Sequence, residues 1–165
     1  MAARKDSEPR RTTVRKTSDR EVVVTRTFDA PARLVFEAWS KPELFKQWWV
    51  PRSMGMTLRS CELDVRTGGT YRLEFGDDPA NPMAFFGRYL EVVPNQRIVW
   101  TNEESGDAAS VTTVTFEERD GTTLLVLTER YPTKEALDEA GTGAQDAMGE
   151  TFEQLDEVLA GLSAH

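Results

Sequence analysis

Histidine and cysteine are almost absent from this sequence, and their scarcity excludes several kinds of active site. The 165 residues include one histidine, His165, and one cysteine, Cys61. Nucleophilic sites of the Ser-His-Asp or Cys-His kind need a positioned imidazole, whereas His165 is the last residue, where fraying is expected. A zinc site needs several His or Cys ligands, and an internal disulfide needs two cysteines. We therefore expect no catalytic triad, no metal site and no disulfide, and we interpret Cys61 as a core or near-core residue.

Long apolar runs and phosphate-binding motifs are missing as well. No run approaches the roughly 20 apolar residues of a membrane-spanning helix, and the first residues lack the apolar core of a secretory signal. We expect no membrane insertion, and a cytoplasmic location. The Gly68-Gly69 pair precedes a predicted strand rather than a helix, so it does not resemble a phosphate cradle. We interpret it as a sharp turn or a close backbone approach, and we expect no cofactor.

Basic residues are scarce outside the N-terminus. Residues 1–20 hold seven of the 20 Lys and Arg but only three of the 28 Asp and Glu, so the remaining chain has a net charge of −12. A body this acidic repels a phosphate backbone, and we expect no nucleic-acid partner. We predict a basic, flexible arm over residues 1–18 and a single domain over residues 19–163; the alternative is an arm that docks on an acidic partner or on the domain itself.

The first part of the predicted domain contains one strand and two short helices. The β-branched run at residues 20–28 indicates a strand. Pro31 suits the start of a helix over residues 31–39, and Pro42 suits the start of another over residues 42–49.

After Pro51 the apolar residues alternate with period two for about eighty residues, which predicts six further strands. Asp120-Gly121 is the strongest hairpin signal among them. Short turns between successive strands indicate an antiparallel meander. The strand candidates lie in "MTLRSCELDVRTGGTYRLEF", "MAFFGRYLEVV", "RIVWTN" and "SVTTVTFEERDGTTLLVLTERY".

The C-terminal segment predicts a long amphipathic helix over residues 144–162, preceded by a separate helical turn or an extension at residues 133–140. Together these elements predict an α+β helix-grip fold, in which a twisted seven-strand antiparallel sheet wraps around the terminal helix. One helix cannot fill such a concavity, so we expect a pocket between sheet and helix.

The sequence resembles the family of activator of heat-shock-protein-90 ATPase homologues, within the START-like (SRPBCC, helix-grip) superfamily. The resemblance rests on "FDAPARLVFEAWSKPELFKQWWVP", "GGTYRLEF", "FFGRYLEVVPNQRIVWT", "DGTTLLVLTE" and the striped terminal helix, and it covers roughly residues 20–162. It implies an enclosed cavity for a hydrophobic small molecule. The family often has a Gly-Trp pair entering the terminal helix, where this chain has Gly143-Ala144, and this departure implies a reshaped pocket.

Three functions fit these observations. The leading hypothesis is non-catalytic binding of a lipid, aromatic or polyketide-like molecule, by a monomer or weak homodimer. The second is a cyclase or dehydratase that uses Arg88, a tyrosine or a carboxylate such as Glu129 or Asp64 as acid or base. The third, implied by the family name, is a chaperone partner that acts on an Hsp90-type ATPase.

Aromatic residues and methionines supply most of the pocket candidates. Phe36 and Trp39 favour the core, whereas Trp48 and Trp49 diverge by about 100° on a helix, so one is expected in the core and one at the pocket rim. Alternation in the strand around Gly87 leaves Arg88 either facing the pocket or, with a bulge at Gly87, in solvent. The candidates are Trp39, Phe45, Trp48, Trp49, Met54, Met56, Tyr71, Phe75, Phe86, Arg88, Trp100, Met148 and Phe152.

Overall fold

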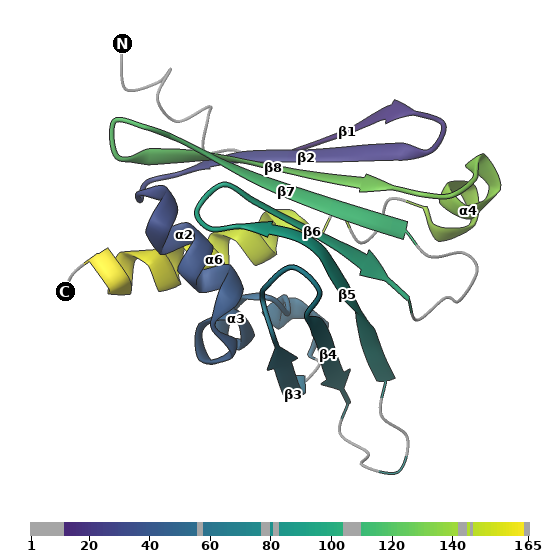
Figure 1. Ribbon diagram of the computed structural model, residues 1–165, viewed down its shortest axis with the longest axis horizontal. Helices are drawn as coiled ribbons and strands as arrows, with labels where there is room; N and C mark the ends of the chain where they lie inside the picture. The colour runs from purple at the N-terminus through teal and green to yellow at the C-terminus, as the bar shows by residue number, and fades with distance from the viewer. Residues whose placement is uncertain are drawn as a thin grey trace.

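A single curved antiparallel sheet and one long helix dominate the computed structural model, which describes residues 12–55, 58–76, 80, 83–103, 110–141, 145 and 147–163 (Figure 1). The strands are β1 (Thr13–Ser18), β2 (Glu21–Phe28), β3 (Leu58–Leu63), β4 (Thr70–Phe75), β5 (Met83–Val93), β6 (Arg97–Asn102), β7 (Ser110–Arg119) and β8 (Thr122–Arg130). The helices are α2 (Ala32–Ser40), α3 (Pro42–Trp48), the 3₁₀ turn η2 (Arg52–Met54), α4 (Lys134–Ala140) and α6 (Met148–Ser163).

The sheet has eight strands in the order β1-β2-β8-β7-β6-β5-β4-β3, and every neighbouring pair is antiparallel. The predicted α+β class and antiparallel sheet are therefore confirmed, but the count of seven strands is wrong. The additional strand is β1, which lies in the segment predicted as a flexible arm. Its charged and mostly exposed residues are those of an edge strand, and edge strands commonly carry such charges to prevent pairing with other chains.

The hairpin between β7 and β8 confirms the turn predicted at Asp120-Gly121. Arg119 pairs with Thr122, so the loop has two residues, and both have positive φ, 53° at Asp120 and 84° at Gly121. Two successive left-handed residues match the twist of the flanking strands.

The two short helices begin at the predicted prolines. Pro31 caps α2 with an extended backbone, and the Ala32 N–H donates to a Glu118 carboxylate oxygen on β7 at 2.9 Å. Pro42 is the first residue of α3, where its missing N–H leaves no intrahelical hydrogen bond unmade. The carboxylate of Glu118 thereby ties the start of α2 to the sheet.

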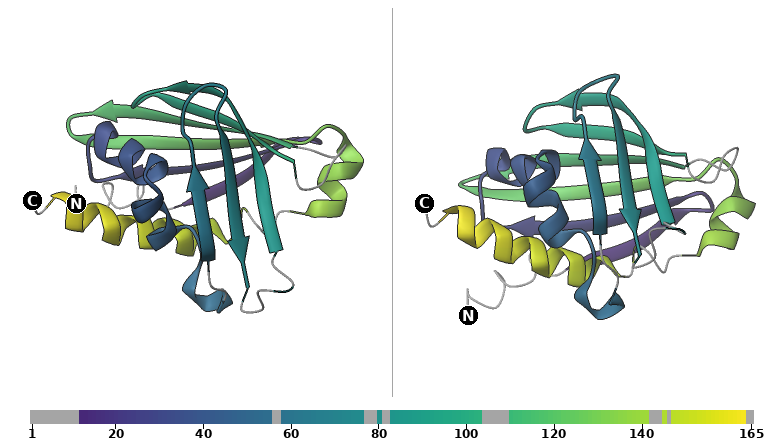
Figure 2. Two further views of the ribbon diagram at one scale, coloured as in Figure 1. Left: turned by 60° about the horizontal axis from the view of Figure 1, so that its bottom comes forward. Right: turned by 90° about the horizontal axis from the view of Figure 1, so that it is seen from below.

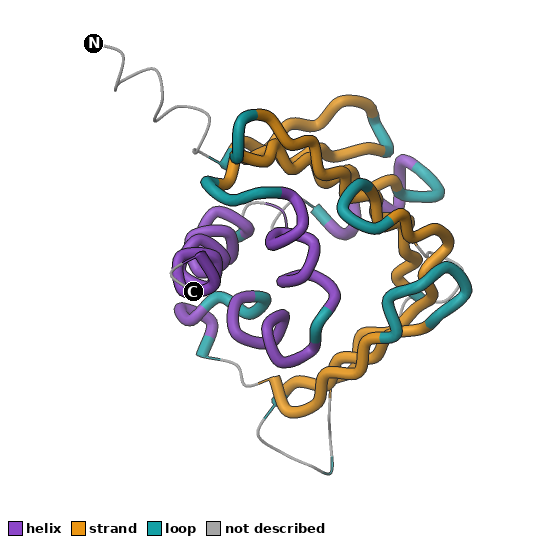
Figure 3. Tube along the Cα trace, turned by 60° about the vertical axis from the view of Figure 1, so that its left-hand side comes forward, coloured by secondary structure: helices purple, strands orange, loops and turns teal. Residues whose placement is uncertain are grey.

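In the described part of the C-terminal segment, α4 and α6 are separate helices. Thr133 caps α4 by accepting a hydrogen bond from the Ala136 N–H, and α4 ends at Gly141, whose φ is 70°. Helix α6 crosses the concave side of the sheet, with α2 and α3 beside it and α4 at the far end (Figure 2). Seen from another side, the sheet wraps around α2, α3 and α6 (Figure 3). No helix in the described part of the chain has the length and apolar character needed to cross a bilayer.

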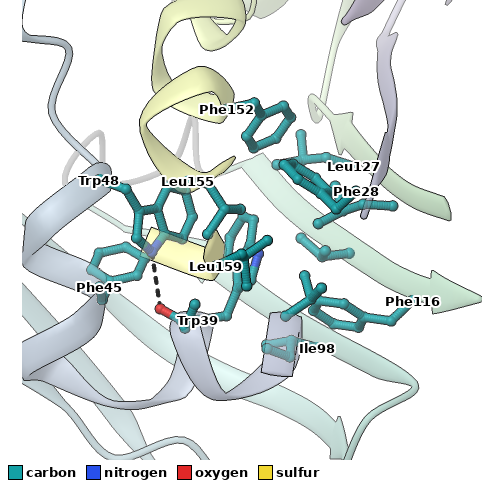
Figure 4. Close-up of a cluster of buried hydrophobic side chains, with 14 of the residues drawn as sticks. Phe28, Trp39, Phe45, Trp48, Ile98, Phe116, Leu127, Phe152, Leu155 and Leu159 are labelled. Atoms are coloured by element: carbon teal, nitrogen blue, oxygen red, sulfur yellow. Dashed lines mark hydrogen bonds between the residues drawn. The ribbon is translucent and has the colours of Figure 1, made fainter. Parts of the chain in front are cut away.

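The core lies between these helices and the sheet (Figure 4). Phe152 and Leu155 of α6 are completely buried, as are Phe28 of β2 and Trp48 of α3. Fully burying a large apolar side chain stabilises a fold by about 1.5–3 kcal/mol. This core accounts for the apolar stripe of the terminal helix.

The Gly68-Gly69 pair forms a tight turn between β3 and β4, as predicted. Gly68 has a φ of 88°, and a Cβ on Gly69 would lie 2.0 Å from the backbone oxygen of Asp64. The first glycine thus supplies a left-handed conformation, and the second permits the backbone to approach itself closely.

Candidate functional site

A cavity of about 950 Å³ lies between the concave face of the sheet and the helices that cover it. Cavities that bind small molecules typically measure roughly 300–1,000 Å³. The lining residues are Trp39, Phe45, Trp49, Val50, Pro51, Leu63, Tyr71, Leu73, Phe75, Met83, Phe85, Tyr89, Ile98, Trp100, Asn102, Ser110, Thr112, Leu127, Glu129, Tyr131, Ala136, Glu139, Ala140, Ala147, Met148 and Thr151.

Aromatic rings form a continuous part of this wall. Trp39 is central, with its ring centroid 5.7 Å from that of Trp49 and 5.8 Å from that of Trp100. Phe45 stacks on Trp49 at 4.8 Å, and Tyr71 meets Trp100 edge to face at 6.5 Å. Contacts of this kind hold the rings in place, because aromatic pairs prefer stacked or edge-to-face geometries. All five residues are among the candidates predicted from the sequence.

Trp48 and Trp49 divide between the core and the cavity. Trp48 is completely buried, and its indole N–H donates to the carbonyl oxygen of Ala38 at 3.0 Å. Trp49 is partly exposed and lines the cavity. The candidate role of Trp48 is therefore corrected to a core role, because consecutive residues at a helix end project in different directions.

Phe86 and Arg88 face away from the cavity, which corrects both as candidates. Arg88 is exposed over 64% of its side chain and donates from Nε to Glu103 at 3.0 Å. The concave face of β5 carries Gly87 and Tyr89 instead. A Cβ on Gly87 would lie only 1.9 Å from a β6 backbone oxygen, so glycine occupies an inward position that the apolar pattern cannot indicate. The irregularity in register lies between residues 89 and 91, not at Gly87.

The candidates from the terminal helix and from the loop that carries Met54 and Met56 differ in whether they line the cavity. Met148 lines the cavity, whereas Phe152 is fully buried against Phe28, with ring centroids 5.4 Å apart. Phe152 is thus corrected to a core residue, because it lies a full turn further along α6. Met56 and the side chain of Met54 lie outside the described residues, so their place at the pocket rim stays a prediction. Phe75 lies in the cavity wall.

Polar side chains form a hydrogen-bonded row across the concave face. Asn102 on β6 is its centre: its Oδ1 accepts from Tyr71 Oη at 3.2 Å and from Trp100 Nε1 at 3.1 Å. Its Nδ2 donates to Ser110 Oγ and Thr112 Oγ1, both at 2.9 Å. All these residues line the cavity. The row fixes side chains that could otherwise adopt several rotamers.

Glu129 on β8 lies at the end of this row. Its carboxylate accepts from Ser110 Oγ at 2.9 Å and from Gln145 Nε2 at 2.9 Å. The same amide nitrogen of Gln145 also donates to Tyr131 Oη at 3.1 Å. Thr112 is the direct cross-strand partner of Glu129 in the β7–β8 pairing, which explains why these polar groups meet.

Two buried polar atoms near the cavity have no hydrogen-bond partner among the described residues. One is the indole nitrogen of Trp39, and the other is Oε1 of Gln145. Both residues are almost completely buried, at 3% and 1% exposure. Buried polar atoms without partners are costly, and they often mark groups that meet a ligand or a water molecule.

Burial changes the acidity of hydroxyl and thiol groups around the cavity. Burial, followed by the charge of Glu129, raises the pKa of Tyr131, although the hydrogen bond from Gln145 opposes this. Burial also raises the pKa of Tyr89. The pKa of the Cys61 thiol rises to about 11 for the same reason, and Cys61 packs against the core as predicted. These groups are neutral at physiological pH.

Of Arg88, Glu129 and Asp64, the acid/base candidates named by residue from the sequence, Glu129 lies in the cavity wall, as do several tyrosines. Asp64 is exposed and accepts from Nε of Arg66 at 3.0 Å, while Arg88 faces solvent. Within the described ranges, no group of three or more His, Cys, Asp or Glu side chains could hold a metal ion.

The polar row itself was not predicted, although the sequence contains a signal for it. Asn102 is in phase with the buried Ile98 and Trp100, and Ser110 is in phase with the buried Val114. Polar residues at inward positions of a strand point into a core or a cavity. Gln145 has no such signal, because no regular apolar pattern surrounds it in the sequence.

Comparison with known proteins identifies relatives across nearly the whole domain. The family model described as "Activator of Hsp90 ATPase homolog 1-like protein" matches residues 29–160. No curated protein matches the chain. The departure expected at Gly143-Ala144 lies outside the described residues.

Several solved structures share the fold. A crystal structure from Rhodobacter sphaeroides has a TM-score of 0.80 and 24% identity, covering 92% of this chain and 99% of that chain. One from Nitrosomonas europaea has a TM-score of 0.77 and 22% identity, covering 91% and 100%. A structure from Rhizobium leguminosarum is 31% identical, with a TM-score of 0.66 and coverage of 85% and 93%.

Proposed function

Since the chain belongs to the activator of Hsp90 ATPase homolog 1-like family, we propose that it binds a hydrophobic small molecule between its sheet and its covering helices. The observation that carries the proposal is the cavity of about 950 Å³, whose wall is mainly apolar and aromatic but contains one ordered polar row. Binding sites for small molecules typically combine an apolar wall with a few fixed polar groups.

The arrangement suits a ligand with a flat or extended apolar body. Rings such as Trp39, Trp49 and Trp100 offer faces and edges for contact, and Met148 adapts its shape to what it meets. The buried indole nitrogen of Trp39 could donate to an acceptor on such a ligand. A lipid, aromatic or polyketide-like molecule has this character.

Saturable binding of neutral hydrophobic probes tests the proposal. We expect Nile red, a flavanone or dodecanol to bind in a one-to-one ratio, as measured by fluorescence titration and native mass spectrometry. Ala147→Trp introduces an indole at the cavity wall, and we expect it to weaken binding at least tenfold. Ala160→Trp adds the same side chain at an exposed position of α6 and should leave binding unchanged. No saturable binding, or equal binding by both variants, would overturn the proposal.

A second candidate function is acid/base catalysis on the bound molecule, because Glu129 and Tyr131 both line the cavity. Gln145 contacts both of them, which orients the pair. Turnover of a polyketide-like substrate that is lost in Glu129→Gln while binding is retained would support this function. If the unchanged protein binds the substrate but does not convert it, the catalytic function is rejected and the binding function remains.

A further inference from the structure

The polar row ends in a negative charge, and this asymmetry restricts the chemistry of the ligand. Two charged residues line the cavity among the described ones, Glu129 and Glu139, and both are acidic. No lysine or arginine among the described residues is part of that wall. A carboxylate in a mostly apolar enclosure interacts more strongly with a ligand charge than one in open water does.

The hydrogen-bond directions along the row reinforce this asymmetry. Trp100 donates to Asn102, Asn102 donates to Ser110, and Ser110 donates to Glu129, while the Tyr71 hydroxyl lies nearer the Thr101 carbonyl oxygen, at 2.8 Å, than Asn102 Oδ1, at 3.2 Å. The donors of Trp100, Asn102 and Ser110 therefore point along the row toward the carboxylate. What the end of the row presents to a ligand is an acceptor.

Gln145 adds an acceptor behind the carboxylate. Its amide nitrogen is used by Glu129 and Tyr131, whereas its Oε1 has no partner among the described residues and the side chain is 1% exposed. This oxygen belongs to the same amide group that donates to Glu129, and Gln145 lies behind the lining residues rather than among them. An unpaired buried acceptor next to a carboxylate is stabilised by a nearby positive charge or a donor.

Aromatic rings in the same wall favour the same charge. Tyr131 lies two residues beyond Glu129 in the sequence. Trp100 of β6 pairs with Thr112 of β7, and Thr112 pairs in turn with Glu129 of β8. The face of an aromatic ring attracts a cation, and protein sites for ammonium groups commonly combine such rings with a carboxylate.

Resting on the proposed function, we infer that the cavity selects hydrophobic ligands that carry a basic amine and discriminates against hydrophobic carboxylates. The ammonium group is placed at Glu129, where its N–H groups donate to the carboxylate. The apolar body lies along Trp39, Trp49 and Trp100. A carboxylate ligand would instead bring a second negative charge to a wall whose described charged residues are both acidic.

Three probes with the same alkyl chain separate charge from hydrophobicity: dodecylamine, dodecanol and dodecanoic acid. Each is titrated below its micelle concentration by displacement of Nile red and by saturation-transfer NMR. We expect the amine to bind at least tenfold more tightly than the acid, with the alcohol between them, since a charge-assisted hydrogen bond of about 1.5–3 kcal/mol corresponds to roughly 10–100-fold. Binding of the acid as tight as that of the amine would overturn the inference.

Glu129→Gln tests the position of the amine, because glutamine keeps the size of the side chain and removes its charge. We expect the preference for the amine over the alcohol, measured with both probes on the same folded variant, to fall about tenfold. Glu153→Gln is the matched control, because it removes the same charge from an exposed position of α6 that does not line the cavity. An unchanged amine preference in folded Glu129→Gln would refute the placement.

Salt separates the enclosed pair from general attraction to an acidic surface. At 0.5 M NaCl, attraction between exposed charges is largely screened, whereas an enclosed pair is screened much less. We expect the difference in binding free energy between the amine and the acid to keep at least half of its low-salt value. A smaller remaining difference would contradict the inference. If none of the three probes binds, the proposed binding function itself fails. If dodecanol binds but the amine binds no better, only the selectivity fails.

Discussion

Gln154 of α6 holds the end of α3 by donating from Nε2 to the carbonyl oxygen of Trp48 at 3.1 Å. The same amide donates to the Val50 carbonyl at 2.9 Å and accepts from the Arg52 N–H at 2.9 Å. The last carbonyl groups of a helix have no partner within the helix, and here one buried side chain from another helix supplies a partner for Trp48 and for two backbone groups of the segment that follows. This contact fixes the segment that carries Trp49 into the cavity wall.

Removing the Gln154 amide should therefore destabilise the protein and loosen the cavity. We expect Gln154→Ala to lower the free energy of unfolding by about 2–4 kcal/mol, because three backbone groups lose their partner and a buried side chain is truncated. Urea denaturation measures the loss. Glu153→Ala, on the exposed side of the same helix, should change it by less than about 0.5 kcal/mol. Equal effects of the two changes would show that the hydrogen bonds of Gln154 do not contribute to stability.

Trp48 and Trp49 should respond differently to the same substitution. Trp48→Phe leaves the Ala38 carbonyl without its indole donor in the core and should cost about 2–3 kcal/mol of unfolding free energy. Trp49→Phe should cost less than about 1.5 kcal/mol, since Trp49 is partly exposed, yet it should weaken Nile red binding. Denaturation and probe titration on both variants check the pair. The reverse pattern would mean that Trp48, not Trp49, forms the cavity wall.

Two glycines should respond to alanine with opposite signs. Gly87→Ala places a Cβ 1.9 Å from the backbone oxygen of Thr101, so β5 and β6 must separate, and we expect a loss of at least about 3 kcal/mol or failure to fold. Gly149→Ala lies within α6, where a Cβ meets no atom within 4 Å among the described residues. We expect it to stabilise the protein by roughly 0.5 kcal/mol. Thermal and urea unfolding would show whether the signs differ.

The Cys61 thiol should react slowly with alkylating agents at neutral and mildly alkaline pH. Burial raises its pKa to about 11, so its thiolate forms only at high pH. We expect the iodoacetamide rate of the folded protein to keep rising up to at least pH 10, whereas a urea-unfolded sample levels off near the ordinary thiol pKa. A folded-state rate that levels off at pH 9 or below would contradict this.

The same shift has a consequence for stability. Between the ordinary thiol pKa of 9.0 and the folded pKa of about 11, the unfolded chain binds fewer protons than the folded one. Stability therefore falls as pH rises through this range, and the raised pKa of Tyr89 adds to the fall at higher pH. Cys61→Ala should make the decline between pH 9 and 11 shallower; an unchanged slope would assign the decline to other groups.

The order and type of most elements could be predicted from the sequence, because they depend on local patterns. Period-two alternation identified β3 to β8. Asp120-Gly121 indicated the hairpin between β7 and β8, since few residue pairs adopt two successive positive φ angles. Strand β1 was missed because its charged residues, such as Arg15 and Lys16, are equally typical of a solvated arm. The local sequence does not distinguish such an arm from an edge strand. The distinction comes from the pairing of β1 with β2 in the folded protein.

The cavity wall could be predicted only in part. Trp39, Tyr71 and Trp100 were candidates because of their size and their strand or helix phase, and the choice between Trp48 and Trp49 stayed open. Phe86 was assigned to the wrong face because Gly87 occupies the inward position. A close approach between two backbones leaves no trace in hydrophobic periodicity.

The fold class, the family and the aromatic residues of the wall can be predicted from the amino-acid sequence, because each depends on residue type and spacing along the chain. That Asn102, Ser110, Glu129 and Gln145 meet in one hydrogen-bonded row is visible only in the three-dimensional fold. These residues come from three strands and a helical turn, and their contacts depend on strand register and on where the chain returns before α6. The position of the negative charge in the cavity wall thus depends on the register with which β6, β7 and β8 pair.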